Sequence, residues 1–233
     1  MSLRYRLVTG LLKAITSALC RIDDRQVVKV PPAGPLILVV NHVNILDVPV
    51  VYTRLRPRPL TAFVKVEAWE NPIERGLLGV WGGIPLHRGQ ADFPAFRQGL
   101  EMLEKGYIVA VAPEGTRNSD GRLIKAQPGV VLLALRSGAP VLPLVYYGHE
   151  HVWQNLKKLR RSAFNFVVGR PFRIVLGTAR ANSQVTQQIV TEVMYQLAAL
   201  LPEQYRGNYA DLEHATTQYL SFLPQQEKST IAA

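Results

Sequence analysis

The stretch around His42 holds residues whose types and spacing could carry out proton transfer. An apolar run at residues 36–40 ends at Asn41 and His42, and Asp47 follows five residues after the histidine. Such a run predicts a strand buried on both faces, and parallel sheets carry their reactive groups just beyond the carboxyl ends of such strands. If Asp47 accepts a hydrogen bond from one imidazole nitrogen, the other nitrogen is free to take a proton from a hydroxyl. The stretch predicts a general base with an orienting carboxylate and no protein nucleophile.

The same spacing occurs at His87 and Asp92, where a structural role is the simpler interpretation. Asp92 precedes a predicted helix over residues 93–105, and an aspartate in that place caps the first turn. A capping role is equally open to Asp47, so the spacing alone does not decide between a catalytic and a structural pair.

A second stretch with chemical potential follows the apolar run at residues 107–112 and contains Glu114, Gly115, Thr116 and Arg117. A glycine at a strand end exposes backbone N–H groups that suit an anion or an oxyanion. The planar guanidinium of Arg117 matches phosphate oxygens, and Glu114 could hold that group or bond a substrate hydroxyl. A solvated turn with an ion pair is the competing interpretation.

His149 and His151 stand two residues apart, a spacing that metal sites also use. No third ligand is apparent nearby, so we expect a polar loop here and no metal site.

Composition limits the classes of partner. The 233 residues carry a net charge of +10, which suits an anionic membrane, a phosphorylated substrate or nucleic acid. The basic residues are scattered and lack the blocks interleaved with aromatic residues that mark many nucleic-acid binders, so we expect no nucleic acid partner. The single cysteine, Cys20, excludes an internal disulfide framework.

The amino-terminal residues 3–21 predict an amphipathic helix. On a helical wheel one face is apolar and the opposite face is polar. The apolar face holds Leu7, Val8, Leu11, Leu12, Ile15 and Leu19, and the polar face holds Arg6, Thr9, Lys13, Thr16 and Ser17. The helix could lie in a membrane interface or pack on the domain's own core, and no stretch of about 18 apolar residues predicts a spanning helix.

The alternation of apolar runs with helical patterns predicts an α/β fold, a single domain with a mixed, largely parallel sheet flanked by helices. We expect an amino-terminal amphipathic, membrane-associated helix at 1–22, the main domain at 23–210 and a polar tail at 211–233, disordered from residue 225. Predicted strands cover residues 36–40, 60–66, 80–86, 107–112, 141–147, 164–168 and 172–176. Predicted helices cover 67–79 in part, 93–105, 128–137 and 184–201.

Four motifs in order resemble those of the glycerolipid acyltransferases, and the lysophosphatidic acid acyltransferase branch most of all. The resemblance spans roughly residues 27 to 180. The motifs are Asn41-His42-x4-Asp47, Ile84-Pro85-Leu86-His87-Arg88, Pro113-Glu114-Gly115-Thr116-Arg117 and Ala139-Pro140-Val141-Leu142-Pro143.

This resemblance implies transfer of an acyl chain from acyl-CoA or acyl carrier protein to the hydroxyl of lysophosphatidic acid, giving phosphatidic acid. His42 would be the general base and Asp47 its orienter. Arg88, Arg117 and Lys65 would bind the acceptor's phosphate. Glu114, Gly115 and Thr116 would shape the acceptor and oxyanion region. The family implies no metal and no cofactor besides the acyl donor, and a peripheral place on the cytoplasmic face of an anionic membrane.

Two positions depart from the pattern of the family. Asn44 stands where a serine is frequent, and His87 stands where an acidic residue is frequent before Arg88. The second change makes the local charge more positive and leaves the acceptor headgroup open. The alternatives are the same chemistry on another lysophospholipid or an acylated amino acid, and a catalytically silent lipid-binding protein.

Overall fold

Five apolar runs form the parallel centre of the sheet. In the computed structural model, which describes residues 3–224, these strands lie side by side in the order β6, β2, β5, β3 and β4. Every neighbouring pair among them is parallel, so their carboxyl ends lie along one edge. Their bounds are β6 Val141–Tyr147, β2 Leu36–Val40, β5 Ile108–Val111, β3 Leu60–Lys65 and β4 Ile84–Leu86.

Four further strands complete a nine-stranded sheet within the described residues. They are β1 Cys20–Asp23, β7 Ser162–Val168, β8 Phe172–Ile174 and β9 Leu220–Phe222. The strand β7 runs antiparallel to β6 and parallel to β1, and β8 runs antiparallel to both β6 and β9. The predicted α/β domain with a mixed, largely parallel sheet is confirmed. The strand β1 was not predicted, because the helical pattern of the first segment extends over Cys20 and Arg21.

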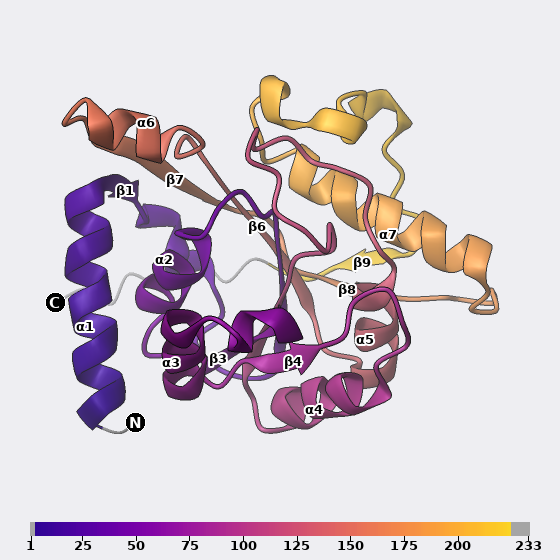
Figure 1. Cartoon of the computed structure of the whole chain (residues 1–233). Helices are drawn as coiled ribbons and strands as arrows, with labels where there is room; N and C mark the ends of the chain where they lie inside the picture. Colours follow the sequence, from indigo (N-terminus) through magenta and orange to yellow (C-terminus); the bar gives the residue numbers. More distant parts are fainter. Residues whose placement is uncertain (1–2, 225–233) are drawn as a thin grey trace, which may run out of the picture.

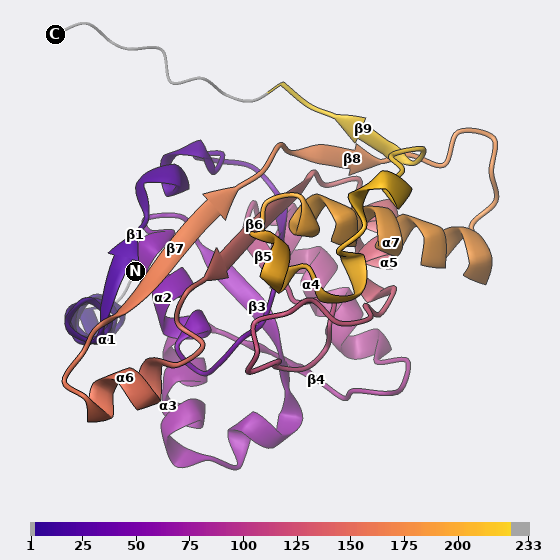
Figure 2. The ribbon, with the colours of Figure 1, turned by 90° about the horizontal axis from the view of Figure 1, so that it is seen from above.

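Helices cover both faces of the sheet, as the two views at right angles show (Figures 1 and 2). One face carries α1 Leu3–Leu19, α2 Asp47–Arg54 and α3 Pro72–Trp81, and the other carries α4 Phe93–Glu104, α5 Gly129–Ser137 and α7 Ser183–Ala198. The short helix α6, Val152–Lys157, precedes β7. Single 3₁₀ turns lie at Arg25–Lys29, Val66–Trp69, Glu203–Tyr205, Gly207–Tyr209 and Leu212–His214.

The strand β2 divides its side chains between two hydrophobic clusters. Ile37 and Val39 pack with α4, α5 and α7, whereas Leu36, Leu38 and Val40 pack with α2 and α3. All five are buried, as expected of a parallel strand covered on both faces.

The segment 80–86 is shorter as a strand than the sequence predicted. Residues 80 and 81 complete α3, and β4 begins only at Ile84. Gly82 ends the helix in the left-handed region with φ 75°, which glycine adopts without steric cost. Pro72 lies in the first turn, where proline is tolerated, and Asn71 caps that turn.

The first helix faces the domain with a different side from the one its wheel suggested. Thr9 and Thr16, assigned to the polar face, are buried. Thr9 accepts a hydrogen bond from the indole nitrogen of Trp81, and Thr16 donates to the carbonyl of Leu12. Small side chains that satisfy their hydroxyls allow α1 to pack closely against α2 and α3.

The opposite side of α1 exposes large apolar side chains. Leu3, Leu7, Leu11 and Ile15 are 70%, 64%, 63% and 43% exposed, and they follow one another at intervals of four residues along the helix. We call these four residues the outer stripe. The apolar face of the wheel is therefore split, since Leu12 and Leu19 pack against the core and Val8 is half-buried.

The predicted tail 211–233 takes part in the fold over its first half. The strand β9 pairs with β8, and the buried carboxylate of Glu192 accepts hydrogen bonds from Thr216, Gln218 and Tyr219. The disorder predicted from residue 225 lies outside the described residues.

Candidate active site

The parallel strands bring the segments of interest to one edge of the sheet. His42 follows β2, the turn with Glu114 and Arg117 follows β5, Lys65 ends β3 and Arg88 follows β4. Since β2 neighbours β5 and β5 neighbours β3, the first two segments are adjacent and the last two lie further along the edge.

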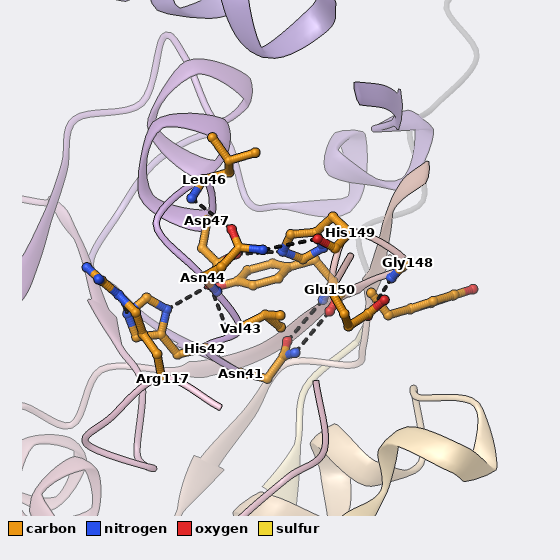
Figure 3. Close-up of polar contacts among 12 residues, drawn as sticks. Asn41, His42, Val43, Asn44, Leu46, Asp47, Arg117, Gly148, His149 and Glu150 are labelled. Atoms are coloured by element: carbon orange, nitrogen blue, oxygen red, sulfur yellow. Dashed lines mark hydrogen bonds and ion pairs between the residues drawn. The ribbon is translucent and has the colours of Figure 1, made fainter. Parts of the chain in front are cut away.

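His42 and Asp47 are in direct contact. The distance from His42 Nδ1 to Asp47 Oδ2 is 2.7 Å, and the same carboxylate oxygen accepts from the backbone N–H groups of Val43 and Asn44 (Figure 3). Asp47 is the first residue of α2, so the turn between β2 and α2 carries both side chains. Burial acts to raise the pKa of Asp47, but hydrogen bonds from His149 and His42 outweigh it and leave that pKa below its ordinary value.

The Arg117 guanidinium forms a hydrogen bond with Nε2, the other ring nitrogen of His42. Its Nε donates to His42 Nε2 at 3.3 Å, so Nε2 is the acceptor nitrogen and Nδ1–H points at Asp47 (Figure 3). This tautomer leaves the basic lone pair directed at the exposed side of the site. A guanidinium and a basic nitrogen therefore share one small region.

Glu114 supports the backbone of His42 and does not hold Arg117. Its two carboxylate oxygens accept from the backbone N–H groups of His42 at 3.1 Å and Ile124 at 3.2 Å. Burial raises the pKa of Glu114 to about 7 despite these two hydrogen bonds, and the charge of Asp47 adds to the rise. Of the two roles open to Glu114, holding the Arg117 guanidinium is not the one found among the described residues, because the carboxylate accepts from these two backbone N–H groups.

The other predicted site residues lie at the same edge without touching His42. Gly115 has φ 68°, which lets the turn fold back after β5, and Thr116 is exposed beside it. The turn is fixed to the base by a hydrogen bond from Asn118 N to the carbonyl of His42. Within residues 3–224, neither Lys65 nor Arg88 bonds to His42, Asp47, Glu114 or Arg117.

Asn41 fixes the register of β2 beside the site. Its side-chain amide donates to the carbonyl of Tyr146 at 2.9 Å and accepts from the N–H of the same residue at 3.0 Å. These two hydrogen bonds join the end of β2 to β6 and fix the position of His42 at the carboxyl edge of the sheet.

His149 is a member of the site that the sequence analysis missed. Its Nε2 lies 2.7 Å from Asp47 Oδ1, and its side chain is completely buried (Figure 3). The expected loop is confirmed, since His149 lies between β6 and α6, but its side chain is buried against Asp47. The rule that selected His42 also places His149 at this edge, because His149 follows the carboxyl end of β6, but its contact with Asp47 depends on β6 being the neighbour of β2.

The second pair, His87 and Asp92, forms a separate contact. Asp92 caps α4 through the N–H of Ala95, as predicted, and also lies 2.8 Å from His87 Nδ1. The pair lines a cavity of about 360 Å³ that none of His42, Asp47 or Arg117 lines. Among the described residues no three or more histidine, cysteine or carboxylate side chains gather as metal ligands.

Comparison with known proteins places this arrangement in a family. The Acyltransferase family profile matches residues 21–147, more than half of the chain. The chain belongs to the acyltransferase family. The matched range contains His42, Asp47 and the turn at 114–117, so these segments of the site are part of the family's shared sequence, whereas His149 lies two residues beyond the match.

Relatives of this acyltransferase agree with the predicted branch. A chloroplastic 1-acyl-sn-glycerol-3-phosphate acyltransferase of Brassica napus is 31% identical over 49% of the chain and 33% of its own length. The human 1-acyl-sn-glycerol-3-phosphate acyltransferase beta is 28% identical over 59% of the chain and 50% of its own length. The chain thus spans about a third to a half of the length of these curated relatives.

A solved structure has the same fold. The 1-acyl-sn-glycerophosphate acyltransferase from Thermotoga maritima superimposes with a TM-score of 0.61 at 21% identity, covering 84% of this chain and 78% of the other. The resemblance to the 1-acylglycerol-3-phosphate acyltransferase branch is confirmed by these matches. None of the helices in residues 3–224 has the length and apolar character needed to cross a bilayer.

Proposed function

We propose that this acyltransferase moves a fatty acyl chain from a thioester donor to the free hydroxyl of lysophosphatidic acid, which gives phosphatidic acid. The observation that carries the proposal is the 3.3 Å contact between Arg117 Nε and His42 Nε2. A phosphate-binding group beside a basic nitrogen suits an acceptor that carries both a phosphate and a hydroxyl. The curated relatives named above act, by their names, on 1-acylglycerol 3-phosphate.

In this mechanism His42 Nε2 takes the proton of the acceptor hydroxyl as its oxygen attacks the thioester carbonyl. The carbonyl oxygen becomes an oxyanion, and the proposed donors to it are the N–H groups of Thr116 and Arg117, since that of Gly115 donates to the carbonyl of Ala112. Collapse of the intermediate breaks the carbon–sulfur bond, and the thiolate takes the proton from His42. The products are the ester and the free thiol of CoA or of acyl carrier protein, and no acyl group is attached to the protein.

Arg117 must leave the base before the hydroxyl can approach it. In the structure its Nε occupies the lone pair that the hydroxyl needs. We propose that the acceptor's phosphate draws the exposed guanidinium away, with Lys65 and Arg88 adding positive charge along the same edge. Acceptors without a phosphate would leave the base covered.

The test is thiol release with lysophosphatidic acid in detergent, with Arg117→Ala beside the wild type. Removing the guanidinium costs a charge-assisted contact of about 1.5–3 kcal/mol, which corresponds to a rise in KM for the acceptor of roughly 10- to 100-fold. A monoacylglycerol, which lacks the phosphate, should be used poorly by the wild type and better by Arg117→Ala, in which no guanidinium covers His42 Nε2.

Arg136→Ala is the matched control, because Arg136 is an exposed arginine in the last turn of α5, where the helix returns to the opposite edge of the sheet. Equal rates with and without a phosphate would contradict the role of Arg117. Activity with another lysophospholipid or an acylated amino acid alone would move the proposal to that acceptor. Vesicle binding without any acyl transfer would favour the silent lipid-binding protein.

We further propose that the enzyme works from the cytoplasmic face of an anionic membrane, where acyl-CoA and acyl carrier protein are available. The support is the outer stripe of α1, which shares the exposed surface of this helix with the cations Arg4, Arg6 and Lys13. Exposed apolar side chains beside cations are the pattern of a helix lying in a bilayer interface.

Changing Leu7 and Leu11 together to serine should weaken binding to vesicles of phosphatidylglycerol and phosphatidylcholine. Partial burial of the two side chains contributes about 2 kcal/mol, so the partition coefficient should fall roughly 30-fold in a sedimentation assay. Leu132→Ser, which changes an exposed leucine on α5, is the control. Unchanged binding by the double variant would exclude the outer stripe as the contact.

A further inference from the structure

His149 reaches the catalytic carboxylate from the strand next to β2. It follows β6 after Gly148, whose φ of 98° turns the chain back toward the site. A Cβ at Gly148 would lie 3.1 Å from the side chain of Asn165 and 3.2 Å from the carbonyl of Ala163, so a larger residue would displace the turn. The turn therefore places the His149 imidazole in contact with Asp47 as a consequence of backbone packing.

The two oxygens of Asp47 are held by different partners. Oδ2 accepts from His42 Nδ1 and from two backbone N–H groups of the preceding turn. Oδ1 accepts from His149 Nε2 at 2.7 Å, and no other donor within residues 3–224 reaches it. The carboxylate is 1% exposed, so water does not replace a lost partner easily. His149 alone fixes the orientation of the half of the carboxylate that faces away from His42.

The surroundings of His149 select one tautomer. Its ring stacks on Phe164 at 4.1 Å and 28°, and the edge of Tyr146 lies against it at 5.8 Å. Its Nδ1 is buried and has no hydrogen-bond partner in the described part of the chain. A proton on Nδ1 would be a buried donor without an acceptor, so the neutral ring with its proton on Nε2 fits the site. The charge of Asp47 then remains available to one imidazolium, that of His42.

We propose that His149 is a positioning residue for acyl transfer, whose neutral Nε2–H holds the Asp47 carboxylate in the orientation that directs His42. This inference rests on the proposed role of His42 as the base. It extends the pair of His42 and Asp47 to a series of three groups with a single negative charge, of which Asp47 and His149 are buried.

Two substitutions separate the hydrogen bond from the shape of the side chain. His149→Phe keeps a flat ring on Phe164 and removes the donor, whereas His149→Gln removes the ring and keeps an N–H donor near the position of Nε2. We expect His149→Phe to lower kcat about 20-fold with KM for the acceptor within about twofold, because the loss falls on the orientation of the base. His149→Gln should recover most of that loss. Both are compared with His151→Phe, a change at the exposed neighbouring histidine.

A spectroscopic measurement decides the same question without turnover. The proton between His42 and Asp47 should give a low-field ¹H resonance that is absent in His42→Ala, shifted in His149→Phe and close to the wild-type position in His149→Gln. In the ¹⁵N spectrum of the wild type, His149 should show a protonated Nε2 and an unprotonated Nδ1, a result that does not require any variant to fold.

Three results would overturn the proposal: unchanged kcat in His149→Phe, equal losses in the phenylalanine and glutamine variants, or a protonated Nδ1 on His149 in the wild type. A wild type that transfers no acyl chain would instead refute the proposed function, and the spectra would still decide the tautomer and its effect on His42.

Discussion

Replacing His42 with alanine should lower acyl transfer about 1,000-fold, in the range that a general base contributes. Without the imidazole, no described group remains that both contacts Asp47 and presents a basic nitrogen to the exposed side of the site. The fold should persist, because Asp47 keeps the N–H groups of Val43 and Asn44 and the ring of His149. The measurement is thioester consumption with lysophosphatidic acid, together with a thermal melt of each protein.

His214→Ala and His87→Ala complete this experiment. His214 pairs with Asp211 on the surface, so its loss should leave the rate unchanged. His87 has the same spacing and its own carboxylate partner, but it is largely exposed and lies at the end of β4. Activity that survives in His42→Ala and disappears in His87→Ala would transfer the role of base to the second pair.

The free energy of unfolding should fall as pH rises from about 4.5 to about 7, through the ionisation of Glu114. The pKa of this carboxyl is about 7 in the folded protein and 4.5 as its ordinary value. Between these values the folded state binds more protons than the unfolded state, so stability falls as pH increases. The stabilisation is complete below pH 4.5 and is lost once pH exceeds about 7, and its full size is on the order of 3 kcal/mol.

The comparison of wild type with Glu114→Gln isolates this effect, since glutamine does not titrate. The variant loses one acceptor for the N–H groups of His42 and Ile124, which lowers its stability at every pH. The free energy of unfolding of the wild type, measured relative to that of the variant in urea titrations, should nevertheless fall by about 3 kcal/mol between pH 4.5 and pH 8. Glu104→Gln, at an exposed glutamate of α4, should follow the wild type, and a constant difference for Glu114→Gln would contradict the expectation.

The sequence allowed the fold and one half of the site to be predicted, for a physical reason. A parallel strand is covered on both faces and is therefore an apolar run, and the residue after it lies at the sheet edge. His42 was found in this way, and so was the turn with Glu114 and Arg117. The hydrogen-bond partners of these side chains could not be predicted from the sequence. The direction of the Glu114 side chain, for example, depends on the backbone N–H of Ile124, ten residues later.

Two features depended on contacts that periodicity does not contain. A helical wheel ranks side chains by polarity, and Thr9 and Thr16 were assigned outward although each satisfies its hydroxyl in the interior. His149 stands between Gly148 and Glu150 in the sequence, so its local context favoured a loop. Only the adjacency of β2 and β6, which the sequence does not specify, brings it to Asp47.

The two hydrogen bonds between Asn41 and the backbone of Tyr146 have a consequence for how precisely the reacting groups are held. They attach Asn41, the residue before His42, to the central strand β6. The position of the base is therefore set by the sheet, which is a rigid part of the protein. Arg117, by contrast, stands on an exposed turn with a single polar contact to the base. The base is thus held rigidly by the sheet, and it is the turn with Arg117 that can move to accommodate substrates of different size.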